Sequence, residues 1–149
     1  MEKMEFNIDI NAPKEKVWNT LWGDDTYREW TSAFAEGSRV DTDWQQGSKV
    51  LFLDEKNSGM VSTIVENKPN EFMSIKHLGI VKDGVEDIDS AESKEWSGGL
   101  ENYTLKSVEG KTHLDIEMSA TGIPEDMINY FQNTWPKALD KLKEIAERN

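Results

Sequence analysis

The sequence predicts an α+β domain in which one seven-stranded antiparallel sheet packs against a long carboxy-terminal helix. Between residues 38 and 120, segments of alternating polarity are separated by short turns, which is typical of antiparallel strands joined in sequence order. An apolar stripe with a spacing of three and four residues follows from residue 124 onward and is typical of an amphipathic helix. The length of 149 residues is the usual size of one domain, so we expect residues 1–149 to share a single core.

One strand and two short helices precede the main run of strands. Alternation over residues 4–10 predicts the first strand. Pro13 is then favourable at the first position of a helix, because its missing amide would be unpaired there in any case. A second short helix is expected to carry Tyr27, Trp30 and Phe34 at a spacing of three and four and to end at Gly37.

Six further strands complete the predicted sheet. Their expected ranges are 38–43, 48–55, 59–67, 71–82, 94–107 and 112–120. Most connections are short and contain Gly, Asn or Pro, so consecutive strands should pair as an antiparallel meander. Residues 83–93 are the exception: they are rich in Asp, Glu and Ser, and we expect a longer, mobile loop.

The last helix is expected to open at Pro124 and to lie across an apolar surface. Its stripe is formed by Ile128, Phe131, Trp135, Ala138, Leu142 and Ile145. Pro136 falls inside the helix and removes the amide that would bond to the carbonyl of Gln132. A kink is therefore expected near residues 132–136.

Composition excludes several classes of function. A formal charge of -12 argues against binding to nucleic acid or to an anionic membrane surface. The absence of cysteine and the presence of two histidines leave few ways to build a zinc site, so we expect no metal and no cofactor. The acidic 83–93 loop lacks the glycine and glutamate of an EF-hand, and a solvated lid is the simpler interpretation. With neither a spanning segment nor a signal peptide in view, a cytoplasmic location is expected.

Four stretches of the chain carry a resemblance to a known superfamily. They are Ile10 to Trp18, Trp44 to Gly47, Trp96 to Leu105, and Trp135 to Lys143. Together they resemble the SRPBCC (START-like, Bet v 1-like) superfamily, and within it the bacterial relatives of the carboxy-terminal domain of the activator of Hsp90 ATPase. The resemblance covers residues 3–147 and implies the helix-grip fold, in which a curved sheet wraps around the last helix.

The resemblance also implies a deep cavity between the concave face of the sheet and that helix. Members of the superfamily bind lipids, hormones, polyketides and other apolar molecules there. We therefore expect aromatic and apolar side chains to form a pocket, although the same side chains could simply fill the core. The candidate ligand-binding residues are Trp18, Trp22, Tyr27, Trp30, Phe34, Phe52, Met73, Ile75, His77, Trp96, Glu101, Tyr103, Met127, Phe131 and Trp135.

One polar pair stands out in this set. Alternation places His77 on the face of Met73 and Ile75, and Glu101 on the face of Tyr103, so a hairpin of the two strands would bring the pair together. The pair could anchor the polar end of a ligand or act as base and acid. It could equally be a structural pair, and a bulge at Gly98-Gly99 would turn Glu101 outward.

Three functions follow as hypotheses. The first is binding of a hydrophobic or amphipathic small molecule without catalysis, by a monomer or homodimer. The second is an interaction module that docks on an Hsp90-type chaperone through its acidic surface. The third is an enzyme similar to polyketide cyclases or hydrolases that uses His77 and Glu101. No nucleophile elbow, phosphate-binding glycine loop or zinc-protease motif occurs in the sequence, so no catalytic residue is assigned.

Overall fold

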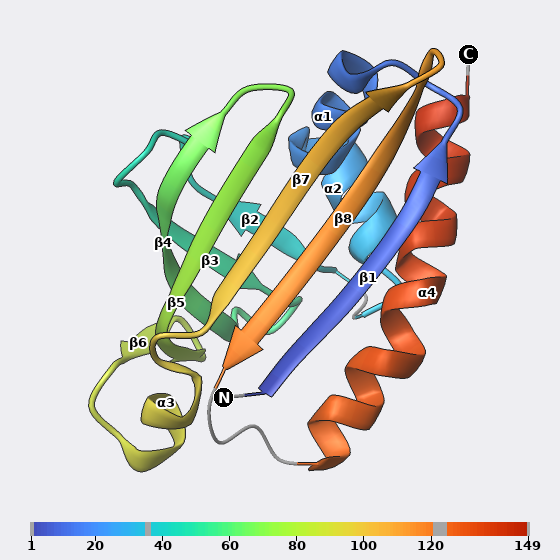
Figure 1. Ribbon diagram of the computed structural model, residues 1–149. Helices are drawn as coiled ribbons and strands as arrows, with labels where there is room; N and C mark the ends of the chain where they lie inside the picture. Colours follow the sequence, from blue (N-terminus) through green and yellow to red (C-terminus); the bar gives the residue numbers. More distant parts are fainter. Residues whose placement is uncertain (1, 35–36, 121–124, 149) are drawn as a thin grey trace.

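The computed structural model describes residues 2–34, 37–120 and 125–148 and gives the predicted α+β helix-grip fold (Figure 1). Its strands are β1 (Glu2–Ile10), β2 (Arg39–Asp41), β3 (Lys49–Leu53), β4 (Gly59–Lys68), β5 (Phe72–Lys82), β6 (Val85–Asp87), β7 (Leu100–Val108) and β8 (Lys111–Ala120). Its helices are α1 (Lys14–Trp22), α2 (Asp24–Thr31), α3 (Ala91–Trp96) and α4 (Glu125–Glu147).

All the strands pair antiparallel in one sheet, in the order β1-β8-β7-β5-β4-β3-β2, with β6 added to the end of β5. The pairing register of the strands is set by the apolar side chains that face the interior. In the β1–β8 pair, for example, Ile8 is opposite Leu114, and both face the interior. A shift of one residue would turn every one of these side chains to solvent, so burial fixes the pairing.

The concave face of the sheet is covered by helices. Figure 1 shows α4 running along β1, with α1 and α2 on the same side of the sheet. Trp135 of α4 is the centre of an aromatic group: its ring centroid lies 5.0 Å from that of Phe34, 5.8 Å from that of Phe6 and 6.0 Å from that of Trp30. Such ring pairs add specific packing energy to the burial of their apolar area. The core is therefore built where the sheet, α2 and α4 meet.

Residues 83–93 differ from the prediction. They contain β6 and the start of α3, and the strand expected from residue 94 begins only at Leu100. Serine chemistry explains the extra helix: the Ser90 hydroxyl caps α3 by accepting a hydrogen bond from the amide of Ser93. The sheet consequently has eight strands in the described residues, one more than expected.

A glycine permits α3 and β6 to dock on β5. A β-carbon at Gly79 would lie 2.3 Å from the carbonyl oxygen of Asp87 and 2.6 Å from the Ser93 hydroxyl. These distances leave no room for any other residue. Gly79 thus allows β6 and α3 to pack in close contact with the backbone of β5.

Other details of the prediction concern the helices. The second helix ends at Thr31, so Phe34 lies in the turn that follows it rather than in the helix. Pro124 lies outside the described residues, and α4 runs on past Pro136 without a break. The kink expected there stays a prediction. Among the described residues, no helix is long and apolar enough to span a membrane.

Candidate functional site

A cavity of about 440 Å³ lies between the concave face of the sheet and α4. Its position follows from the fold, because α4 covers the β1 side of the sheet while β3 and β4 continue beyond it (Figure 1). The described lining residues are Trp22, Tyr27, Trp30, Thr31, Phe34, Ser38, Phe52, Leu53, Asp54, Ser58, Gly59, Met60, His77, Leu100, Glu101, Tyr103, Met118, Ser119, Met127, Tyr130, Phe131 and Trp135. These lining residues are mainly apolar, the aromatic ones form the largest group, and polar side chains lie between them.

Most of the residues expected at a ligand pocket meet at this cavity. They are Trp22, Tyr27, Trp30, Phe34, Phe52, His77, Glu101, Tyr103, Met127, Phe131 and Trp135. They come from α1, α2, β3, β5, β7, α4 and the turn after α2. Only the tertiary fold brings these segments together.

The remaining expected residues lie elsewhere. Ile75 is fully buried in the core, next to the cavity wall but not part of it. Trp18 and Met73 line a second hollow near Trp44. Residue 96 ends α3, and the side chain of Trp96 lies outside the described part of the chain.

The main polar group of the cavity is the Glu101 carboxyl. Burial raises the pKa of Glu101 to about 7, and the hydrogen bond with the Tyr103 hydroxyl acts in the opposite direction. Burial, and to a smaller extent the charge of the Glu101 carboxyl, raises the pKa of Tyr27 and Tyr103, so both phenols stay neutral. The side chain of Glu101 keeps a partial exposure and lines the cavity. A carboxyl that titrates near neutrality is therefore available to a bound molecule.

His77 lines the same cavity, but its partner is not Glu101. Its Nδ1 atom lies 2.7 Å from the Ser62 hydroxyl, which is fully buried on the neighbouring strand β4. Burial lowers the pKa of His77 to about 4, so the imidazole is neutral at pH 7. The β5–β7 register has Ile75 opposite Glu101, and the amide of His77 bonds to the carbonyl of Gly99. This register brings both polar residues to one face, as the alternation predicts.

The wall also contains Tyr130, an aromatic residue of the last helix that the sequence offers for a pocket, whereas sequence reasoning missed Met118 in the wall and Ser62 as the partner of His77. Tyr130 donates a 2.5 Å hydrogen bond to the carbonyl of Phe34 and so ties α4 to the segment after α2. Met118 continues the inward alternation of β8, which could have been read from the sequence. Ser62 could not have been found, because its contact with His77 depends on the β4–β5 register, which shifts between Val61 and Ser62.

The described residues of the cavity wall do not form a set of metal ligands. Within residues 2–34, 37–120 and 125–148, no three His, Cys, Asp or Glu side chains group in a way that could hold a metal ion. The chemistry available in the described wall is therefore hydrogen bonding and charge from Glu101, hydrogen bonding from Tyr27 and Tyr103, and contact with aromatic faces.

Comparison with known families agrees with this architecture. The family model described as activator of Hsp90 ATPase homolog 1-like protein matches residues 11–147. The chain belongs to this family. The match spans all the described cavity-lining residues. No curated protein is similar enough to the chain to match it.

Solved structures support the fold of this member of the activator of Hsp90 ATPase homolog 1-like family. Protein MLL2253 from Mesorhizobium loti has a TM-score of 0.78 at 17% identity, over 99% of this chain and 98% of that protein. The Aha1 dimer from Colwellia psychrerythraea has a TM-score of 0.73 at 21% identity, over 99% and 97%. DynU16, a protein of the dynemicin biosynthetic locus, has a TM-score of 0.74 at 12% identity, over 99% of this chain and 48% of DynU16.

Proposed function

We propose that this protein binds a small molecule with an apolar, aromatic body in the cavity between its sheet and α4, without catalysing a reaction. The single observation that supports this proposal most is the cavity itself. At about 440 Å³ it falls within the usual range of ligand pockets, about 300 to 1,000 Å³. The cytoplasmic location expected from the sequence stays part of the proposal.

The wall of the cavity has the composition that such a ligand needs. Ring faces from α1, α2, β3, β7 and α4 offer apolar contact from several directions. A few polar groups, led by Glu101, can fix the orientation of the ligand. His77 is held by Ser62 and neutral, which supports a structural role for its imidazole rather than that of a base.

A blocked cavity tests the proposal. Met118 lines the cavity on β8 directly opposite Glu101, whereas Val108 ends β7 with 52% of its surface exposed. We expect the wild-type protein to bind 2-(2-naphthyl)ethanol saturably in calorimetry, and Met118→Trp to weaken binding by about tenfold or more by filling the space. Val108→Trp adds the same side chain outside the cavity and should bind like the wild type. Absence of saturable binding to the wild type, or equal losses in both variants, would contradict the proposal.

Docking on an Hsp90-type chaperone is a second candidate, which the family membership favours. The acidic net charge of -12 would steer such an encounter, and salt would screen it. The test is the ATPase rate of a bacterial Hsp90 with and without this protein at low and high salt. An altered rate at low salt that vanishes at high salt supports docking. An unaltered rate together with no complex at low salt excludes it. The dimeric Aha1 relative supports measuring the homodimer in the same experiments.

A further inference from the structure

We propose that the ligand is a cation: an aromatic or apolar body carrying a protonated amine, whose ammonium group pairs with the Glu101 carboxylate inside the cavity. This inference rests on the proposed binding function and adds the charge of the ligand to it. Three features of the cavity carry it: the sign of its charged groups, the incomplete pairing of Glu101, and the aromatic faces around that carboxyl.

The charged groups of the cavity wall are acidic. Among the described lining residues none is Lys or Arg, and the two that carry carboxyl groups are Glu101 and Asp54. Asp54 is occupied in its turn, because its Oδ1 atom accepts hydrogen bonds from the amides of Lys56 at 2.8 Å and Ser58 at 3.1 Å. His77 is neutral. Glu101 has fewer donors from the described chain than Asp54, so we assign the charge of the ligand to Glu101.

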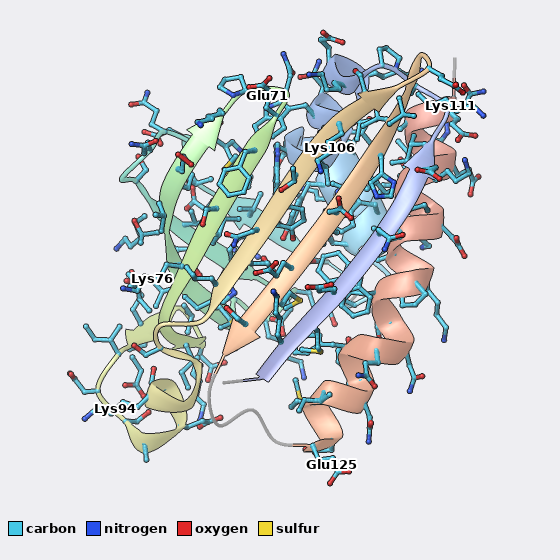
Figure 2. All side chains as sticks on the ribbon, viewed as in Figure 1. Glu71, Lys76, Lys94, Lys106, Lys111 and Glu125 are labelled. Carbon is cyan, nitrogen blue, oxygen red and sulfur yellow. The ribbon has the colours of Figure 1, made fainter. Side chains whose placement is uncertain are left out.

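The basic residues of the same strands lie on the other face of the sheet. Lys76 and Lys106 are exposed, and they stand between inward-facing neighbours on β5 and β7. Figure 2 labels both on the outer, helix-free face, and it labels Lys94 and Lys111 at the periphery of the molecule. Strand alternation keeps such side chains out of the cavity. The described wall of the cavity therefore offers Glu101 no basic side chain as a counter-charge, and a bound ligand can supply one.

Glu101 has capacity for such a partner. An ionised carboxylate offers about four acceptor sites, and the Tyr103 hydroxyl uses one of them. A carboxylate left unpaired in an apolar cavity is unfavourable, which agrees with the raised pKa of this group. An ammonium group at this position would favour the charged form and donate the missing hydrogen bonds.

Aromatic faces add to the preference for a cation. Tyr103 and Tyr27 are the phenols that interact with Glu101, and Trp22 packs against Tyr103 with ring centroids 4.8 Å apart. Ring faces attract cations within about 6 Å and do not attract anions. The indole N–H groups of Trp22 and Trp135 are donors without partners in the described chain, but both are covered, so an anionic ligand would not reach them in this conformation.

A ligand series with one apolar body tests the proposal on the native protein. The probes are 2-(2-naphthyl)ethylamine, 2-(2-naphthyl)ethanol and 2-naphthylacetate, titrated by calorimetry at pH 8 and low salt. We expect the amine to bind about tenfold or more tighter than the alcohol, and the carboxylate to bind more weakly than the alcohol. Equal affinities for amine and alcohol, or tighter binding of the carboxylate, would overturn the charge assignment while leaving the binding function intact.

A matched pair of variants assigns the effect to one carboxyl. Glu101→Gln keeps the size of the side chain and removes the charge, whereas Glu117→Gln makes the same change of net charge on the outer face of β8. We expect Glu101→Gln to lose the preference for the amine and to keep its affinity for the alcohol. Glu117→Gln should behave like the wild type. If neither amine nor alcohol binds the wild type, the proposed function itself fails. A preference for the amine that both variants reduce equally would reflect net charge and overturn the role of Glu101.

Discussion

At the scale of single residues, two titratable side chains of one cavity shift in opposite directions. Burial disfavours the charged form of each: it lowers the pKa of His77 from 6.5 to about 4 and raises that of Glu101 from 4.5 to about 7. Folding therefore loses stability through His77 as the pH falls from about 6.5 to 4, because only the unfolded chain gains that proton. It loses stability through Glu101 as the pH rises from about 4.5 to 7, because only the unfolded chain releases that proton.

The two histidines should titrate far apart. His113, on the outer face, lies 2.6 Å from Asp9 and 3.1 Å from Asp115, and the hydrogen bond with Asp9 is the largest cause that raises its pKa. We expect the ring carbon signals in an NMR titration to show His113 protonated and His77 neutral at pH 5.5. His77→Gln removes one set of signals and so assigns them. Two rings that titrate together near pH 6.5 would contradict the burial of His77.

The Glu101→Gln variant should become more stable than the wild type as the pH rises. Gln has no carboxyl to ionise, so we expect a gain of roughly 2 kcal/mol in the free energy of unfolding at pH 8 and less than about 1 kcal/mol at pH 5. Urea unfolding at the two pH values measures this difference. Glu117→Gln, which makes the same change of net charge on the outer face of β8, is the control. The same difference at both pH values for Glu101→Gln would show that this carboxyl ionises normally in the folded state.

At the scale of elements, the segment between β5 and β7 is the part of the chain where the structure differs most from the prediction. Its acidic composition predicts a solvated loop, and most of its side chains are indeed exposed. Local caps and one close approach nevertheless give it structure: Ser93 is fully buried and its hydroxyl donates to the carbonyl of Asp87 and accepts from the amide of Ile80. A polar segment can thus pack on a sheet through hydrogen bonds, although its low apolar content does not predict any ordered structure.

Substitution of Gly79 tests this docking. We expect Gly79→Ala to lower the free energy of unfolding by about 2 to 4 kcal/mol, because its β-carbon would overlap the backbone of Asp87 and Ile88. Gly84→Ala is the comparison: that glycine has a φ of 83° with open space around it, so the cost there should be about 1 kcal/mol of backbone strain. Urea unfolding measures both. Equal costs would mean that β6 and α3 move away from β5 without penalty.

At the scale of the whole molecule, charge opposes folding. The chain carries 29 acidic and 17 basic residues, and its described ion pairs have largely exposed side chains. Exposed pairs contribute little, whereas the excess of negative charge repels itself in the compact state. The aromatic core under α4 must outweigh this repulsion.

Added salt should therefore stabilise the protein. We expect the thermal midpoint to rise by a few degrees between about 10 mM and 500 mM NaCl, because ions screen the repulsion. KCl at the same ionic strength should give the same rise, since screening does not depend on which monovalent cation is present. A falling midpoint would show that the ion pairs outweigh the net charge.

Local patterns in the sequence were sufficient to predict most of the fold. Alternation predicted seven of the eight strands, and the stripe around Trp135 predicted α4, because the period of apolar residues follows directly from backbone geometry. β6 was missed because it has three residues and lies in an acidic segment. The contact of Ser62 with His77 was missed because a bulge sets it, and a bulge leaves no periodic signal.

The sequence by itself determined the order of the elements, the face that each one buries and the acidic character of the surface. Each of these depends on residues that are neighbours in the chain. Only the tertiary structure decided that Glu101 and His77 share one cavity but not one hydrogen bond, and that the described wall of that cavity contains no basic residue. These facts depend on register and on the distance between α4 and the sheet, which side chains from remote segments set together by packing.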